Sequence, residues 1–394
     1  MNDRMKKKIK MGIYAIGLLM MGVIGINSSL ATIGAAFPDI SQTMIQNLIS
    51  VPCVAVIPTT LLTGKLMEKF SKKNIVLVGI VCFIVGGVAP AFINSFTGIL
   101  VMRAILGVGV GICQVVSTAL AVENFDGHES QEVQGVLQSA QMIGCAVMVF
   151  LGGTLADLNW HYAFLVHLIG IIAFILVVFT IPVNKPIKQQ SEKGKVHLTK
   201  KTWIWALFMC VLFVAFQVYN VTFSFLVSEA QLGSATDAGL SVAFFTIGGA
   251  IMGILYGKLA QLLKNYCISL ACLLLTISFI LIANASNMVM CYVGSILFGV
   301  AIVTSLPGVF IQAGLSVDTV SAGFAVSVVT CAQNFGQFIC PYILNPLSNV
   351  LTLSAVNSRT CFMLGAILSA VLAIIMFIWG KKENHLGKIG ENNE

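Results

Sequence analysis

Runs of apolar residues, each about 20 residues long or longer, follow one another along nearly the whole chain, with short polar segments between them. A hydrocarbon core of about 30 Å takes about 20 apolar residues in a helix. We therefore predict transmembrane helices at about 11–36, 43–63, 75–93, 97–122, 134–156, 160–182, 203–228, 238–262, 267–284, 288–314, 321–347 and 356–379. No segment alternates as barrel strands do, so the predicted fold is an all-α membrane protein with twelve transmembrane helices.

The scarcity of charge excludes a soluble globule. Charged residues make up 9% of the 394 residues, whereas hydrophobic residues make up 58%. A soluble domain carries roughly 25% charged residues because its surface faces water. The first apolar run follows five basic residues, as in a signal peptide, but hydrophobicity continues to the end and no small-residue cleavage site follows. We interpret this run as a retained first helix.

The basic residues indicate the orientation. If the N-terminus is cytoplasmic, all of the 22 lysines and arginines except Arg103 and Arg359 fall on the cytoplasmic side. An excess of these residues marks that side of a membrane. We predict a multi-pass protein of the cell membrane with both termini cytoplasmic. Because the net charge of +7 follows the membrane, it does not indicate a nucleic-acid partner.

The chain divides into two halves that resemble each other. Residues 183–202 form the longest polar stretch between helices, and we interpret them as a cytoplasmic linker. It joins a six-helix bundle at 1–182 to a second bundle, with a cytoplasmic tail, at 203–394. Each half carries a glycine, a lysine and a leucine at a helix end before a short basic loop, at 64–74 and at 257–265. Parallel repeats of this kind predict a substrate site between two rocking bundles.

The first of these loops resembles the signature G-x-L-x-D-R-x-G-R-R of the major facilitator superfamily. The matching residues are Gly64, Leu66, Lys69, Lys72 and Lys73, whereas Glu68 replaces the aspartate and Ser71 the second glycine. The stretch from Arg103 to Gly111 is similar to the family's R-x-x-x-G-x-G pattern, and residues 160–164 are similar to its W-R-x-x-F. The resemblance implies the major facilitator fold and transport by alternating access.

One departure from the family concerns the fifth helix. Antiporters of the family usually carry G-x-x-x-G-P-x-x-G-G there. Gly144, Gly152 and Gly153 match this pattern, but Met148 and Val149 stand where the glycine and proline belong. We expect a less bent helix, and exchange against protons does not follow from the resemblance.

Five residues form the predicted gate: Gly64, Glu68, Lys72, Lys73 and Arg103. A carboxylate at a helix end can meet the N-termini of other helices, whose dipoles favour an anion. Alternatively, the loop lysines only anchor the topology. Arg103 lies within a span, where a charge is costly and indicates function by default. Its alternative is a structural role, with the guanidinium bonding backbone carbonyls of the first helix.

Proton-carrying groups are scarce in the predicted spans. No aspartate or glutamate lies well inside a span, and His167 is the only histidine away from the end of one. We expect its helix to be peripheral, which favours packing over a proton relay. The sequence therefore predicts weak coupling to protons, coupling through a charge on the substrate, or coupling through an outer carboxylate.

Uncharged polar residues gather at similar depths in several spans. An amide that faces lipid is costly, so most of these side chains should face protein or a wet cavity. Hydrogen bonding between helices is the alternative for each of them. The predicted substrate-binding residues are Asn27, Gln114, Gln217, Asn220, Thr304, Gln333, Asn334 and Gln337.

This composition favours one class of solute. The predicted cavity is polar but nearly uncharged, with Phe216, Phe223, Phe310 and Phe335 nearby. It suits an amphiphilic or lipophilic organic solute, and we predict a secondary transporter that exports it. Import or facilitated diffusion of a small organic metabolite is the alternative. The sequence shows no paired carboxylates and no HExxH motif, so we expect no enzyme activity, no cofactor and no metal. The expected partners are a small-molecule substrate and the lipid bilayer, and the expected state is a monomer.

Overall fold

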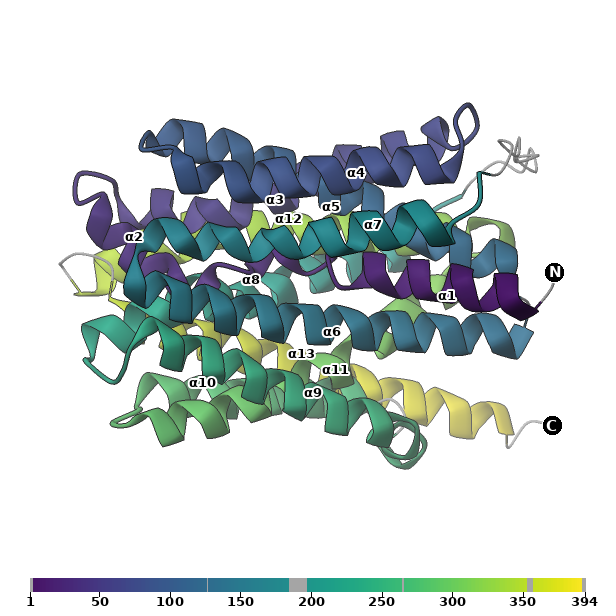
Figure 1. Cartoon of the computed structure of the whole chain (residues 1–394). Coiled ribbons are helices and arrows are strands. Elements are labelled where there is room, and N and C mark those ends of the chain that lie inside the picture. Colours follow the sequence, from purple (N-terminus) through teal and green to yellow (C-terminus); the bar gives the residue numbers. More distant parts are fainter. Residues whose placement is uncertain (1–2, 126, 184–196, 264–265, 353–356, 392–394) are drawn as a thin grey trace. The chain divides into compact units, whose positions relative to one another are not determined.

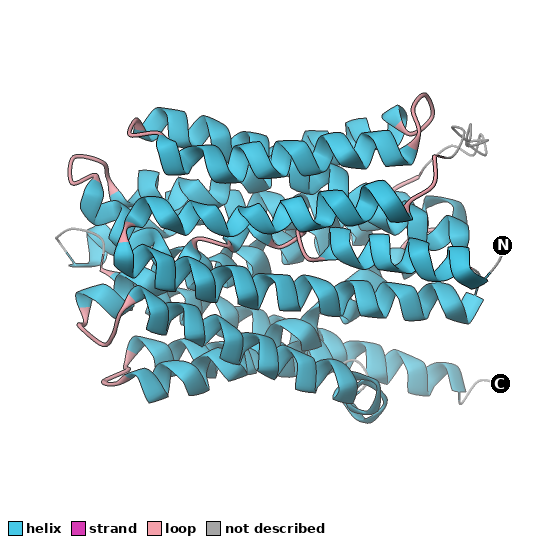
Figure 2. Ribbon diagram, viewed as in Figure 1, coloured by secondary structure: helices cyan, strands magenta, loops and turns pink. Residues whose placement is uncertain are grey.

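The computed structural model describes residues 3–125, 127–183, 197–263, 266–352 and 357–391, and every regular element in these ranges is a helix (Figures 1 and 2). The all-α prediction is confirmed. Within the described residues, ten helices are long and apolar enough to cross a membrane, and Cys267–Ala283 is apolar but shorter. Helix α12 (Thr319–Thr352) is not among the ten. The count of twelve spans stays a prediction.

The chain divides into two compact units. Unit 1 comprises Met1–Glu192 together with Gly233–Leu240, and unit 2 comprises Lys193–Leu232 together with Ser241–Glu394. Most of the predicted linker, residues 184–196, lies outside the described residues. The helix α9 (Ala235–Leu263) begins among the residues that cluster with unit 1 and continues in unit 2.

The other elements are distributed between the two units as follows. Unit 1 contains α1 (Asp3–Gly17), η1 (Gly22–Ile24), η2 (Asn27–Ser29), α2 (Leu30–Ala36), α3 (Gln42–Leu66), α4 (Lys72–Val88), η3 (Ala89–Phe92), α5 (Phe96–Asn124), α6 (Gly127–Leu158), η4 (Trp160–Leu168) and α7 (Ile169–Thr180). Unit 2 contains α8 (Lys200–Glu229), α10 (Cys267–Ala283), α11 (Met288–Leu315), α12 and α13 (Ser358–Glu391).

Glycines allow the closest helix contacts within each unit. A Cβ on Gly107 of α5 would collide with the backbone of Pro52 in α3. Gly107 belongs to the R-x-x-x-G-x-G pattern, so this contact gives the motif glycine a packing role. In unit 2, a Cβ on Gly336 of α12 would collide with the backbone of Cys210 in α8. Helices in lipid associate through such close packing, because lipid tails are as apolar as leucine.

The first span is interrupted, although the sequence predicts one helix at 11–36. Helix α1 ends at Gly17, and the chain then continues through turns and the short helices η1 and η2 before α2 begins at Leu30. Near the middle of the span, α-helical bonding therefore gives way to i→i+3 bonds, such as those from the N–H of Gly22 to Leu19 and from the N–H of Gly25 to Gly22. Carbonyls freed in this way need other donors, because irregular backbone at membrane depth is tolerated only where protein or water satisfies it.

Candidate functional site

Arg103 donates hydrogen bonds to this interrupted span. The residue is fully buried in unit 1, and one Nη donates to the carbonyl oxygen of Val23. Its Nε donates to the carbonyl oxygen of Leu48 in α3 at 2.7 Å. Both acceptors are backbone groups, one of them freed by the break. These contacts match the structural alternative for Arg103, and its role in gating stays a prediction.

His167 completes the packing around the break. It is fully buried, with Nδ1 2.9 Å from the carbonyl oxygen of Phe164 and Nε2 3.1 Å from that of Gly22. An Nη of Arg103 lies 3.4 Å from the same Nε2. Gly87 of α4 makes room for the ring, since a Cβ there would collide with it. The histidine contacts the first span directly, although we expected its helix to be peripheral. Its contacts favour the packing interpretation.

Two serines attach the interrupted span to α6. Ser28 Oγ donates to the carbonyl oxygen of Val149 at 2.9 Å, and Ser29 Oγ donates to that of Gly152 at 3.0 Å. Gly152 lets the two segments approach, because its Cβ would lie 2.6 Å from the carbonyl oxygen of Gly25. Helix α6 is one continuous element through Met148 and Val149. The residues that replace the family's Gly-Pro pair therefore lie in regular helix, and Val149 accepts a bond from the first span.

Two lysines of the loop signature form contacts with the ends of other helices. Lys72, 6% exposed, forms an ion pair with Glu123 at the end of α5, with 2.8 Å between Nζ and Oε2. Lys73 Nζ donates to the carbonyl oxygen of Val178 in the last turn of α7 at 2.6 Å. Cations at helix C-termini complement the helix dipole. Ser71, which replaces the family's glycine, caps α4 by accepting a bond from the N–H of Asn74.

Two members of the predicted gate remain exposed. A Cβ on Gly64 would meet nothing within 4 Å. The side chain of Glu68 is exposed and forms no ion pair or hydrogen bond with any described residue. The contact predicted between the Glu68 carboxylate and the N-termini of other helices therefore stays a prediction, and it would belong to another conformational state.

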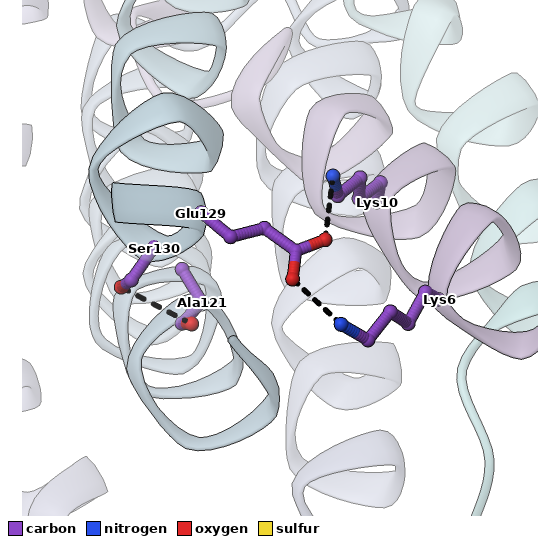
Figure 3. Close-up of polar contacts among 5 residues, drawn as sticks. All are labelled: Lys6, Lys10, Ala121, Glu129 and Ser130. Carbon is purple, nitrogen blue, oxygen red and sulfur yellow. Dashed lines mark hydrogen bonds and ion pairs between the residues drawn. The ribbon is translucent and has the colours of Figure 1, made fainter. Parts of the chain in front are cut away.

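A second basic cluster lies at the beginning of α1 (Figure 3). Glu129, near the start of α6, accepts from Lys6 Nζ at 2.6 Å and from Lys10 Nζ at 3.0 Å. The hydrogen bond from Lys6, followed by that from Lys10, lowers the pKa of Glu129 below its ordinary value. The bonds connect the N-terminal basic segment to α6, which the sequence alone did not indicate.

In unit 2, Gln217 is a buried amide with unusual surroundings. Its side chain is fully buried in α8, and neither Nε2 nor Oε1 has a hydrogen-bond partner among the described residues. An unpaired buried polar group costs about 1–3 kcal/mol. Asn220, one turn further along the same helix, is also buried. Gln217 therefore does not show the bond that a role in joining helices requires.

Aromatic residues pack around this part of α8. Phe216 stacks on Phe298 of α11 with 5.2 Å between ring centroids, and Tyr219 stacks on the same ring at 4.4 Å. Phe223 stacks on Tyr219 at 4.8 Å. By contrast, Phe335 of α12 is 46% exposed. Two of the four phenylalanines predicted to lie near the substrate thus belong to the aromatic core of unit 2.

The amides of α12 lie at a different level of α8 from Gln217. Gly336 contacts Cys210, and Gln333 and Gln337 lie within one turn of Gly336 on the same helix. Gln217 follows Cys210 by two turns, or about 10 Å at 1.5 Å per residue. Gln333 and Gln337 are half-buried, as is Asn334, whose Nδ2 donates to the carbonyl oxygen of Thr330 at 3.0 Å.

The remaining predicted binding residues differ in burial and in whether their polar side-chain atoms already have hydrogen-bond partners. Thr304 is fully buried and its hydroxyl donates to the carbonyl oxygen of Val300 in its own helix at 2.6 Å. In unit 1, Asn27 is buried at the break in the first span and Gln114 is half-buried on α5. Thr304 therefore has less bonding capacity left for a solute than Gln217.

The sequence interpretation missed a polar face on α3. Gln46, Asn47 and Ser50 are all buried, and Ser50 Oγ has no hydrogen-bond partner among the described residues. Gln42, Gln46 and Ser50 recur every four residues, which places them on one face of the helix. The spacing could have identified this face, which makes α3 a further candidate for contact with substrate.

Comparison with known proteins establishes the family. The family model described as "Major Facilitator Superfamily" matches residues 12–341. The chain belongs to the major facilitator superfamily, and it is a multi-pass membrane transporter rather than an enzyme. The resemblance inferred from the loop signature and the Arg103 pattern is confirmed at the level of the family.

Two relatives illustrate the range within this family. The chain is 26% identical over 216 residues to the multidrug efflux pump SdrM of Staphylococcus aureus (strain N315), covering 53% of this chain and 47% of that protein. It is 26% identical over 195 residues to the riboflavin transporter RibZ of Clostridioides difficile (strain 630), covering 48% and 42%. The matched region thus spans less than half the length of each of these relatives.

Solved structures agree on the fold. A crystal structure of a mutant of the nucleoside transporter NupG has a TM-score of 0.79 at 13% identity, covering 94% of this chain and 99% of that one. A crystal structure of a D-xylose-proton symporter has a TM-score of 0.74 at 15% identity, covering 94% and 96%. At these identities the likeness concerns the fold alone.

Proposed function

We propose that this protein is a twelve-helix secondary transporter of the cell membrane that exports a small amphiphilic or lipophilic organic solute by alternating access. Both termini would be cytoplasmic, and α12 would be one of the twelve spans. Its amides lower its hydropathy, which is expected of a helix that lines a wet path rather than lipid. The similarity to the efflux pump SdrM supports export.

The observation that carries this proposal is the Gln217 carboxamide. Both of its polar atoms are buried without a protein partner among the described residues, and aromatic rings surround its segment of α8. A solute with an apolar body and a few polar atoms would complement such a site, because ligand pockets are mainly apolar with a few well-placed polar groups. A polyanion would need cations, and Arg103, the one basic residue in the predicted spans besides Lys258 and Arg359 near the span ends, is bonded to backbone carbonyls.

Import of a small organic metabolite is the second candidate. The similarity to the riboflavin transporter RibZ over 195 residues supports a small organic metabolite as the solute. Riboflavin presents a planar ring with polar edges, so one carboxamide beside aromatic rings could serve either candidate.

Flux measurements test the proposal. The purified protein in liposomes should move a lipophilic fluorescent solute with saturable kinetics, and Gln217→Leu should reduce this flux. Solute accumulation in everted membrane vesicles distinguishes export from import, because these vesicles take up the solutes that intact cells export. Accumulation of riboflavin by intact cells, without vesicle loading of lipophilic solutes, would replace the first candidate by the second. Non-saturating conduction would contradict both.

Coupling and orientation have separate tests. We expect an imposed pH gradient without membrane potential to drive little accumulation of a solute of constant charge. Strong accumulation that survives Asp39→Asn, Glu229→Gln and His167→Ala would contradict weak proton coupling. In a cysteine-free background, a single cysteine at Ser234 should react with impermeant reagents added to cells, and one at Lys69 should not. The opposite pattern would reverse the orientation.

A further inference from the structure

Unit 1 carries a groove of about 420 Å³ that the transport proposal does not use. Its lining comes from α1, α6 and α7, which lie side by side in Figure 1. The lining residues are Lys7, Lys10, Met11, Tyr14, Ala15, Leu18, Ala140, Ile143 and Leu176. All the cationic groups belong to the beginning of α1, and the remaining lining is apolar apart from the hydroxyl of Tyr14.

Helix α1 supplies one continuous face of this groove. Lys7, Lys10, Tyr14 and Leu18 are separated by three or four residues, which places them on one side of the helix and its extension. The face extends from Lys7 to Leu18, about 16 Å at 1.5 Å per residue. Charge is thus confined to one end of an apolar groove whose length suits part of an acyl chain.

The ion pairs leave positive charge at that end. Glu129 accepts from Lys6 and Lys10 together, and Glu132 adds a second negative charge near Tyr14, so Lys6, Lys7 and Lys10 exceed these two carboxylates by one charge. Lys7 is exposed and forms no ion pair with a described residue. Clusters of lysine and arginine beside a transmembrane helix attract anionic lipid headgroups, at about 1 kcal/mol for each basic residue. The groove therefore has charge complementarity to a phosphate at one end and to hydrocarbon along the rest.

We propose that this groove binds an anionic phospholipid. Its phosphate would lie at Lys7 and Lys10, within reach of the Tyr14 hydroxyl, and an acyl chain would lie along Leu18, Ile143 and Leu176. A tyrosine at headgroup level is typical of membrane interfaces. The lipid would lie in the leaflet on the side of the N-terminus. Only the identification of this leaflet as the cytoplasmic one depends on the orientation proposed above.

Lipid binding to the purified full-length protein tests this directly. Native mass spectrometry would count bound phosphatidylglycerol and phosphatidylcholine of identical acyl chains. The wild-type protein should retain phosphatidylglycerol preferentially, and Lys7→Gln should weaken its binding about fivefold, the change expected for one basic residue. Lys8→Gln is the matched control, because Lys8 is an exposed neighbour that does not line the groove.

A second pair of variants tests the acyl chain. Ile143→Trp would fill the groove and should displace phosphatidylglycerol, whereas Ile172→Trp, at a similarly exposed position of α7 outside the groove, should not. If Lys7→Gln and Lys8→Gln weakened phosphatidylglycerol binding equally, the binding would reflect unspecific attraction by the basic segment, and the proposed site would be overturned. Undiminished binding in Lys7→Gln or Ile143→Trp would also overturn it. Because no flux is measured, these outcomes are independent of the export proposal.

Discussion

Arg103 in unit 1 and Gln217 in unit 2 are both polar, fully buried residues of membrane-spanning helices, yet their environments differ. Arg103 donates to the carbonyls of Val23 and Leu48 and lies beside His167. Gln217 has no partner for either polar atom among the described residues. A charge in a span is the stronger sequence signal, whereas an unsatisfied amide leaves more capacity to bind a solute. Whether a buried polar side chain already has hydrogen-bond partners thus separates structural residues from candidate binding residues better than its polarity does.

The largest effect should come from Arg103→Met. This change leaves the carbonyls of Val23 and Leu48 without their donor, and each unsatisfied group in a membrane interior costs several kcal/mol. We expect a large loss of folded protein and a lower unfolding temperature in detergent. Flux per folded molecule should stay near the wild-type value. Normal stability combined with abolished flux would instead place Arg103 in the gate and break the comparison.

Gln217→Leu should have the opposite signature. The carboxamide has no bond to lose among the described residues, so an apolar side chain of similar size should leave the unfolding temperature unchanged or raise it. Transport should fall about three- to tenfold, which corresponds to the loss of one or two neutral hydrogen bonds. If stability and flux fell together, Gln217 would be a structural residue after all.

Hydropathy measures what lipid requires of a helix, and it identified the ten helices that are long and apolar enough to cross a membrane, whereas α12 is not among them in the described residues. Hydropathy could not predict the break in the first span. Gly22 and Gly25 occur in an apolar run, where glycine is frequent in continuous transmembrane helices as well. The groups that satisfy the break, Arg103 and His167, are 80 and 145 residues away from their acceptors Val23 and Gly22. Only the folded chain brings them together.

The candidate site could be proposed from the sequence as a set of amides but not as a geometry. Equal depth was inferred from position within each apolar run, and this places Gln217 level with Gln333. The packing of Gly336, which lies between Gln333 and Gln337, on Cys210 instead puts this glycine about two turns of α8 away from Gln217. Hydropathy also shows which side chains are polar but not which are bonded, so Thr304 and Gln217 are equivalent until their partners are known.

Tyr219→Phe sharpens the comparison within α8. Tyr219 is buried two residues beyond Gln217, and its Oη lies 2.8 Å from Ser295 Oγ. Removing a satisfied neutral hydrogen bond should cost about 0.5–1.5 kcal/mol. Ser295 keeps its bond to the carbonyl oxygen of Cys291, so the loss should stay within this range. We expect a lower unfolding temperature with nearly unchanged flux. A flux loss as large as that of Gln217→Leu would extend the binding site to the aromatic core.

The smallest effect concerns Glu129, a charged group that is paired but half-exposed. Its bonds to Lys6 and Lys10 lower its pKa in the folded protein. A carboxylate with a lowered folded-state pKa stabilises the fold at pH values above its unfolded pKa, about 4.3. That contribution is lost as pH falls through the lowered folded pKa. Thermal unfolding of the wild-type protein should therefore show no loss from this pair between pH 8 and pH 5.

Glu129→Gln should lower the unfolding temperature by on the order of 1 °C at pH 7, because exposed pairs contribute little. The difference from wild type should vanish below the folded pKa. Asp39→Asn is the control, since Asp39 is exposed and forms no ion pair with a described residue. It should leave the unfolding temperature at pH 7 unchanged. A difference for Glu129→Gln that persists in acid would show that the side chain contributes by packing rather than by charge. The presence of an ion pair would then not be enough to identify a structural polar group in unit 1. The difference between such groups and Gln217 would rest on how deeply each side chain is buried.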